Sequence, residues 1–167
     1  MLSSEGGARC AAVGTTAGPG VMGSATTVLG DGGSVTFDDR GSVEIALLHD
    51  GMALVGRNDD ALVQGANVAM LGDELIQFGV AEQIGETSWR LSRLLRGRRG
   101  SEWACASHAI GEAFVLLEAE TLAAQALPLG SLGGSVRVLA SGVGDASGVE
   151  AEMLVQGRAL RPPAPVH

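Results

Sequence analysis

The sequence contains no lysine and no tyrosine, and aromatic residues make up only 3% of its 167 positions. All 11 basic residues are therefore arginine. Together with the bias towards alanine, glycine and valine, this is typical of a GC-rich coding sequence, so the use of arginine in place of lysine carries little chemical information. With so few aromatic rings, the core must be built from Ala, Val, Leu and Ile, and a hydrophobic content of 46% is enough to build it.

Long apolar runs are also absent. No stretch approaches the roughly 18 uninterrupted apolar residues that a membrane-spanning helix needs, so membrane insertion is not expected. The first residues, MLSSEGGARC, lack a basic segment followed by an apolar one, and they do not predict a secretory signal. Cys10 and Cys105 are the only cysteines, and we expect both thiols to be reduced and structural.

Positive charge is scarce relative to negative charge. The formal net charge is −8 and the pI is about 4.7, which argues against a general nucleic-acid-binding protein with a broad basic face. Glycine, by contrast, is abundant at 26 residues and follows no G-X-Y period. This pattern predicts many turns and short strands rather than long helices.

Apolar and β-branched runs bounded by glycine predict about ten short strands and two short helices, without regular βα alternation. We therefore expect an all-β, β-dominated fold, a short-stranded barrel- or sandwich-like domain with one or two short helices. The predicted organisation is a flexible lead-in over residues 1–20, a β-rich domain over 21–157 and a proline-rich linker over 158–167.

The clearest local signal is a hairpin at Gly72 and Asp73, between the apolar runs NVAML and ELIQF. Glycine at the first central position of a two-residue loop fits a type II′ turn. A second hairpin is expected around Gly85 and Glu86, and a third around the segment DDRG, with strands over residues 34–37 and 43–48.

Two short helices are expected. Asn58 is a suitable N-cap for the segment NDDALVQ, which has aspartates in its first turn and ends before a glycine. Residues 118–127, EAETLAAQAL, consist of helix-forming residues and stop at Pro128. A final pair of strands is expected in GSVRVLAS and VEAEMLVQG, around a glycine-rich turn.

Several motifs match the residue pattern of a functional site but lack the spacing or the structural context that the site requires. Gly18 to Gly23, GPGVMG, matches G-x-G-x-x-G, but a β-branched segment follows where the dinucleotide site requires a helix. A grouping of Glu102, Cys105, His108 and Glu112 has no recognised zinc spacing. Ser107 and His108 beside Glu112 lack a nucleophile elbow, so we expect no catalytic residue, no metal ligand and no cofactor.

The densest charge lies in RLLRGRRG, where four of the seven residues from 93 to 99 are arginine: Arg93, Arg96, Arg98 and Arg99. Guanidinium groups pair bidentately with carboxylates, and the chain holds 19 acids, so we expect ion pairs within the fold. At least two of Arg96, Arg98 and Arg99 should reach a carboxylate or a backbone carbonyl. The first candidate partners are Glu74, Glu102 and Glu112, while contact with a protein partner or with nucleic acid stays open.

The block from Gly65 to Glu118 resembles phage tail proteins that form tail-tip or baseplate hubs in siphophages and, most closely, in the gene transfer agents of alphaproteobacteria. That family carries GxNxAxxGxELIQF, then LxxLLRGRRGTEWA, then HxxGExFVLL, with serine replacing the threonine here at Ser101. The resemblance extends weakly over most of the chain. It rests on Gly65, Asn67, Gly72, Glu74, Phe78, Leu94 to Gly100, Glu102, Trp103, His108, Gly111, Glu112 and Phe114.

This resemblance implies a structural protein of a phage or gene transfer agent particle, present in the bacterial cytoplasm during assembly. It implies a homotrimeric hub through which DNA passes, joined to a distal tail protein and to cell-wall hydrolase or fibre domains. The linker would lead to a fibronectin-like domain. The interaction loop would comprise Arg96, Gly97, Arg98, Arg99, Gly100, Ser101, Glu102, Trp103 and His108.

Two alternatives to the hub role stay open at this point. One is a free-standing remnant of a prophage tail gene. The other, weaker, is a small hydrolase that works through Ser107 and His108. An acidic domain suits the hub, because a like-charged lumen repels the phosphate backbone and allows DNA to pass without specific binding.

Overall fold

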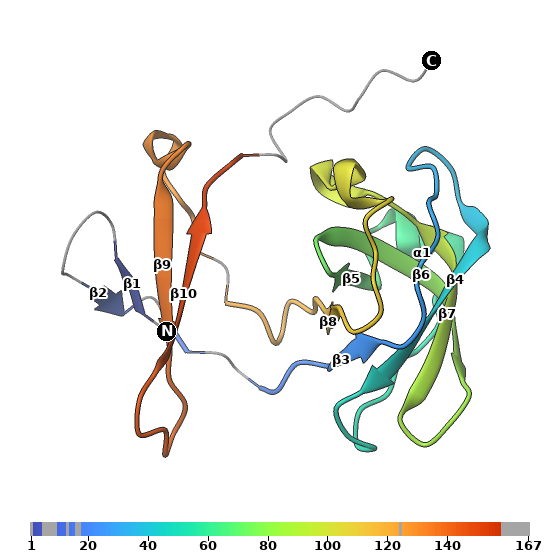
Figure 1. Ribbon diagram of the computed structural model, residues 1–167, viewed down its shortest axis with the longest axis horizontal. Coiled ribbons are helices and arrows are strands. Elements are labelled where there is room, and N and C mark those ends of the chain that lie inside the picture. Colours follow the sequence, from blue (N-terminus) through green and yellow to red (C-terminus); the bar gives the residue numbers. More distant parts are fainter. Residues whose placement is uncertain (1, 5–9, 13, 16–17, 124, 158–167) are drawn as a thin grey trace. The chain divides into compact units, whose positions relative to one another are not determined.

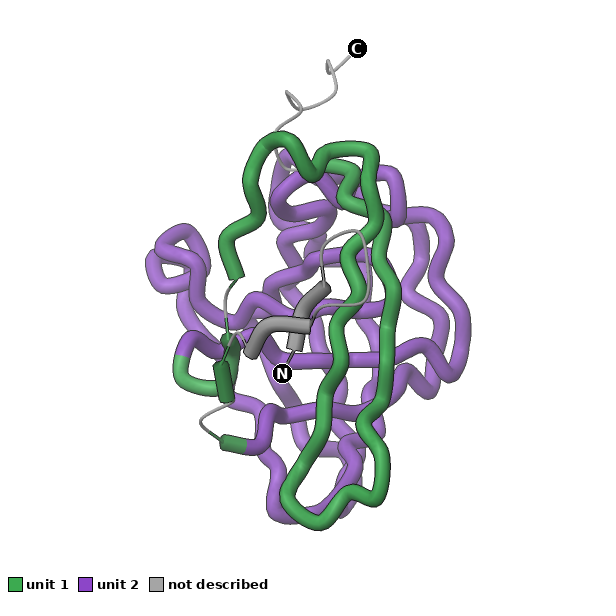
Figure 2. Tube along the Cα trace, turned by 90° about the vertical axis from the view of Figure 1, so that its left-hand side faces the viewer, with its two compact units in different colours: residues 1–18, 120–157 green, residues 19–119, 158–167 purple. Residues whose placement is uncertain are grey.

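A computed structural model describes residues 2–4, 10–12, 14–15, 18–123 and 125–157. The chain divides into two compact units, one drawn from residues 1–18 and 120–157 and the other containing residues 19–119 (Figure 2). The sequence instead predicts a single domain over residues 21–157. The predicted linker, residues 158–167, lies outside the described residues.

The larger unit is a closed barrel of six antiparallel strands in the order β3-β4-β7-β6-β5-β8 (Figure 1). The β-dominated fold expected from the sequence is confirmed. The strands are β3 (Met22–Ala25), β4 (Asp38–Leu47), β5 (Val68–Leu71), β6 (Glu74–Gln83), β7 (Ser88–Leu95) and β8 (Ala113–Leu116).

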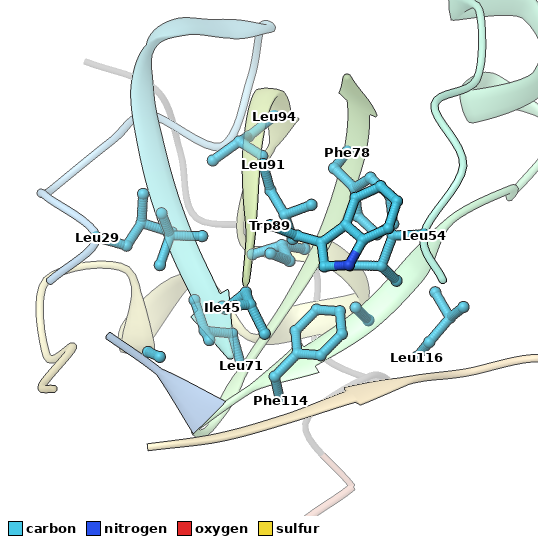
Figure 3. Close-up of a cluster of buried hydrophobic side chains, with 14 of the residues drawn as sticks. Leu29, Ile45, Leu54, Leu71, Phe78, Trp89, Leu91, Leu94, Phe114 and Leu116 are labelled. Carbon is cyan, nitrogen blue, oxygen red and sulfur yellow. The ribbon is translucent and has the colours of Figure 1, made fainter. Parts of the chain in front are cut away.

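The barrel interior is the hydrophobic core. In the second half of β4 every second side chain is buried, from Val43 to Leu47. Side chains of the other strands also turn inward, as Figure 3 shows for Leu71, Phe78, Leu91 and Phe114. Burying a side chain of this size stabilises the fold by about 1.5–3 kcal/mol relative to leaving it exposed. As expected, most of the core side chains are aliphatic.

The β5–β6 hairpin is confirmed, with Leu71 paired to Glu74 across two central residues. Gly72 has φ +56°, whereas Asp73 has no positive φ, which fits the predicted type II′ turn and not a type I′ turn. The Gly72 amide also donates to the Ala113 carbonyl at 2.9 Å, so the turn is tied to β8. The hairpin around Gly85 and Glu86 is also present, joining β6 to β7.

The hairpin expected around DDRG is wrong. These residues lie within the single strand β4, and the pairing with β7 shifts register between Asp38 and Ser42. The Asp38 carboxylate accepts hydrogen bonds from the Gly41 and Arg40 amides, at 2.7 and 3.1 Å. The local turn chemistry therefore forms a bulge that the strand accommodates.

Of the two predicted helices, one is correct. Helix α1 (Asp59–Val63) begins after Asn58, whose side chain accepts from the Ala61 amide at 3.0 Å. The described residues of 118–127 do not form the expected helix. The next regular element along the chain is the 3-10 turn η3 (Leu129–Ser131). A short segment with a mostly exposed surface lacks the tertiary packing that stabilises helices of this length.

The smaller unit is a four-stranded antiparallel sheet in the order β10-β9-β1-β2. Its strands are β1 (Leu2–Ser4), β2 (Cys10–Ala12), β9 (Ser135–Ala140) and β10 (Val149–Leu154), so the two expected final strands are confirmed. Two short strands of this sheet therefore lie inside the predicted lead-in. Among the described residues, no helix has the length and apolar character needed to cross a membrane.

Candidate functional site

The arginine-rich segment leaves β7 at Leu95 and forms two consecutive 3-10 turns, η1 (Arg98–Gly100) and η2 (Glu102–Ala104). Gly97, Arg99 and Gly100 all have positive φ. A Cβ on Gly97 would lie 2.9 Å from Glu102 and 3.0 Å from Ser34, so only glycine fits this position. We refer to residues 96–108 as the arginine loop, which appears in yellow shades in Figure 1.

Arg96 is fully buried although it is permanently charged. Its Nε and Nη2 atoms donate to the Glu74 carboxylate, with distances of 2.9 Å to Oε1 and 2.9 Å to Oε2. Nη2 also donates to the Cys105 carbonyl at 2.9 Å, and Nη1 donates to the Gly30 carbonyl at 2.9 Å and to Asp38 Oδ2 at 3.4 Å. Every edge of the guanidinium group thus faces an acceptor.

Glu74, the first residue of β6, is the fully buried counterion. Besides Arg96, its Oε1 accepts from the Gly97 amide at 2.6 Å and from the Cys105 thiol at 3.3 Å. Burial acts to raise the pKa of Glu74, but hydrogen bonds from Arg96, Gly97 and His108 outweigh it and hold the pKa below its ordinary value. The carboxylate is therefore stabilised in its ionised form.

His108 joins this pair to a second carboxylate. Its side chain is 1% exposed, with Nε2 2.6 Å from Glu74 Oε2 and Nδ1 2.7 Å from Glu112 Oε1. Glu112 in turn lies against the β5–β6 turn, because a Cβ on Gly72 would collide with its carboxylate. The buried ionic cluster, as we define it, comprises Asp38, Glu74, Arg96, Cys105, His108 and Glu112.

Cys105 is a free, buried thiol, in agreement with the expectation of a reduced structural cysteine. Burial, followed by the negative charge of Glu74, raises the pKa of the Cys105 thiol to about 12. The thiol therefore stays protonated and acts as a weak donor to Glu74 rather than as a nucleophile.

A second polar network lies beside the cluster. Arg98 Nε donates to Gln77 Oε1 at 2.9 Å, and Gln77 Nε2 donates to the carbonyls of Leu62 and Ala66 at 2.6 and 2.7 Å. The Ser101 hydroxyl donates to the Arg98 carbonyl at 2.8 Å and accepts from the Leu75 amide at 2.9 Å. These bonds fix the arginine loop to helix α1 and strand β6.

The remaining predicted loop residues are less buried. Arg99 is exposed and has no ion pair within the part of the chain that the structure describes, and the Trp103 side chain is 52% exposed. Of these three arginines only Arg96 therefore reaches a carboxylate or a backbone carbonyl, because Arg98 donates to the side-chain oxygen of Gln77. The expectation for two of the three guanidinium groups is wrong.

Among the predicted carboxylate partners, Glu74 is correct. Glu112 contacts His108, and no bond joins the half-exposed Glu102 to an arginine among the described residues.

The ion pairing expected for Arg93 is present, with a partner that the sequence did not name, whereas the pairs of Arg90 were not anticipated. Arg93, at φ 53°, forms a bidentate pair with Asp59 at 2.9 and 2.6 Å and stacks 4.5 Å above the Phe37 ring. Arg90 lies directly opposite Glu44 and Glu82 on the neighbouring strands and bonds both. The strand register, which the sequence did not provide, is the signal that would have revealed the Arg90 pairs.

The other motifs do not assemble into reactive sites. The Ser107 hydroxyl donates to the Ala104 carbonyl at 2.9 Å, and both ring nitrogens of His108 face carboxylates, so His108 does not activate Ser107. Within the described ranges, no three His, Cys, Asp or Glu side chains are arranged to hold a metal ion. The motif GPGVMG leads into strand β3 and not into a helix.

The comparison with protein families matches the part of the chain that holds the barrel and the buried ionic cluster. The family described as Rcc01698-like, C-terminal, matches residues 20–115, more than half of the chain. The matched segment runs from just before β3 into β8 and so contains the whole barrel apart from its last strand residue. The comparison with curated proteins gave no match. The match thus covers the barrel up to Val115 and every residue of the buried ionic cluster, and the chain belongs to the Rcc01698-like, C-terminal family.

Proposed function

We propose that the chain is a structural component of a phage or gene transfer agent tail tip or baseplate hub, and that it is not an enzyme. The observation that carries the proposal is the family match, which covers almost the whole barrel. The motifs of the resemblance lie within that same segment, apart from the last two residues of the third motif. In this role the barrel contributes to a homotrimeric ring that contacts a distal tail protein and fibre or cell-wall hydrolase domains.

The chemistry of the charged side chains supports a structural role. Three reactive side chains of the matched segment that lie close together, Glu74, Cys105 and His108, are buried, and Glu74 is bonded to both of the others. Such buried groups make their hydrogen bonds within the fold. They add rigidity and have no hydrogen-bonding capacity left for a substrate. The hydrolase alternative has no supporting geometry, since Ser107 donates to a backbone carbonyl.

The test is the location of the protein in particles. An epitope-tagged chain, in its natural gene, should co-purify with tails and label one end of the tail by immunogold electron microscopy. The gene's deletion should abolish DNA transfer while heads still form. Absence of the chain from purified particles, or full transfer in the deletion strain, would contradict the proposal and favour the remnant of a tail gene.

A biochemical measurement addresses the non-enzymatic part of the proposal. The purified chain should show no turnover of ester, peptide or glycoside substrates. His108→Ala should lower thermal stability without altering any rate. Hydrolysis that disappears in that variant would establish the hydrolase instead.

A further inference from the structure

The position of His108 raises the question of its protonation. Each ring nitrogen lies within hydrogen-bonding distance of a different carboxylate oxygen, Glu74 Oε2 and Glu112 Oε1. An ionised carboxylate only accepts hydrogen bonds, and a neutral imidazole has one N–H. With both carboxylates ionised, both contacts are hydrogen bonds only if His108 carries two N–H groups.

The charges around His108 favour the same state. Glu74 faces it from β6, Glu112 from the segment before β8, and Arg96 and Cys105 from the arginine loop through Glu74. Asp38 of β4 contacts Arg96 on the far side. With neutral His108, one arginine would balance three carboxylates inside a poorly solvated site, whereas an imidazolium reduces this excess of negative charge.

The bonds of His108 also connect separate parts of the barrel. Glu74 begins the second strand of the β5–β6 hairpin, Glu112 lies against the turn of that hairpin at Gly72, and His108 ends the arginine loop. The segment between His108 and Glu112 is otherwise held by few bonds, of which Gly111 N–H to the Ala25 carbonyl at 2.8 Å is the shortest. The contacts of His108 are thus the main side-chain interactions that hold this segment in place.

We infer that His108 is a proton-dependent clasp: as an imidazolium it fastens the end of the arginine loop to the β5–β6 hairpin, and loss of its proton loosens residues 105–112. Deprotonation would leave one nitrogen lone pair against a carboxylate oxygen and would turn one attractive contact into a repulsive one. Loosening therefore follows a rise in pH. This inference is independent of the proposed function, because it concerns the barrel alone.

The direct test is the ¹⁵N NMR spectrum of the imidazole rings in the full chain, between about pH 5.5 and about pH 8.5, where histidine charge changes occur. At the lower pH, both ring nitrogens of His108 should show the shifts of protonated nitrogen and both N–H protons should be visible. A neutral ring with one bare nitrogen at the lower pH would overturn the inference.

Amide exchange tests the loosening. The protection factor of the Gly111 amide should fall roughly tenfold or more on passing from the lower to the higher pH, because a charge-assisted bond is lost. The Arg57 amide, bonded to Gly79 on β6, should keep its protection and serves as the internal control. Equal changes at both amides would show a general effect of pH and contradict the clasp.

Two variants separate the clasp from a merely structural histidine. Glu112→Gln replaces an obligate acceptor by an amide that can either donate or accept, so the variant should fold and its Gly111 protection should lose most of its pH dependence. His49→Asn removes an exposed histidine and should leave the wild-type pH profile intact. A wild-type profile in Glu112→Gln, or a flattened one in His49→Asn, would refute the proposal.

Discussion

At the scale of single residues, one arginine of the four differs in kind from the others. Arg96 is a buried cation whose partners come from four separate segments: Gly30, Asp38, Glu74 and Cys105. Forming such a pair costs both groups their hydration, so the pair itself adds little net stability. Removing one member is a different matter, because it leaves the other charge buried without compensation.

Arg96→Met should therefore destabilise the barrel by about 3–5 kcal/mol, since Glu74 loses its counterion. Urea unfolding followed by tryptophan fluorescence measures the effect. Arg99→Ala is the matched control from the same loop and should leave the transition midpoint unchanged, because Arg99 is exposed. Similar midpoints for both variants would show that the buried pair does not contribute as the geometry requires.

The lowered pKa of Glu74 predicts how the stability of the fold depends on pH in the acid range. Its folded pKa is lowered, so the stability it contributes is fully present above the ordinary glutamate pKa of about 4.3 and is lost as pH falls through the lower folded value. Wild-type stability should decline steeply in this acid range. Glu74→Gln should be less stable at neutral pH and should decline less steeply with acid. Parallel acid profiles for the two proteins would exclude Glu74 as the group responsible.

At the scale of elements, the β5–β6 hairpin and the arginine loop depend on each other. The hairpin turn needs a positive φ at Gly72, and the Glu112 carboxylate that bonds His108 occupies the space beside that glycine. The loop needs the same conformation at Gly97 for its own packing. Two turns of unrelated sequence thus meet at one ionic cluster, and a change in either turn disturbs both.

Gly72→Val should cost about 1–3 kcal/mol of backbone strain and should also displace Glu112 from its place beside the turn. Thermal melting measures the loss of stability. Gly30→Val provides the comparison, because a Cβ at Gly30 meets nothing within 4 Å and its φ is not positive. If Gly72→Val melted with the wild type, the assigned turn type would be incorrect.

At the scale of the whole molecule, the chain consists of two units that differ in how many hydrophobic side chains they bury. The barrel unit contains the hydrophobic core cluster, the buried ionic cluster and the whole family match. In the smaller unit, every residue of β10 is exposed and Val136 is its one buried hydrophobic residue among those described. Independent stability is therefore expected of the barrel alone.

A fragment comprising residues 19–119 should fold without the smaller unit. Its strands close on themselves, so no strand edge depends on a segment outside the fragment. Circular dichroism should show a cooperative thermal transition with native-like strand content, and the Arg96→Met change should lower its midpoint as in the full chain. A fragment that is unfolded at low temperature would show that the barrel requires the remaining segments.

The local sequence was sufficient for features that depend on a few adjacent residues. The Gly72–Asp73 hairpin and the Asn58-capped helix were both predictable, because a positive φ and a side-chain cap are properties of the residues themselves. The DDRG hairpin and the helix over residues 118–127 were predicted incorrectly by the same reasoning. In β4 the pairing with β7 on both sides of the bulge decided the outcome, and the described residues of 118–127 are mostly exposed, so tertiary packing does little to favour a helix there.

The candidate site divides in the same way. The sequence by itself determined that the chain is an acidic, glycine-rich, β-dominated protein whose arginine-rich segment calls for carboxylate partners, because composition and residue chemistry do not depend on three-dimensional arrangement. It also named Glu74, Glu102 and Glu112 as candidate partners of the arginines, of which only Glu74 is correct. Only the tertiary structure decided that Arg96 is buried while Arg99 is exposed, and that His108 bridges two carboxylates. Those outcomes depend on the closure of the barrel, which brings residues more than 20 positions apart into one poorly solvated cluster.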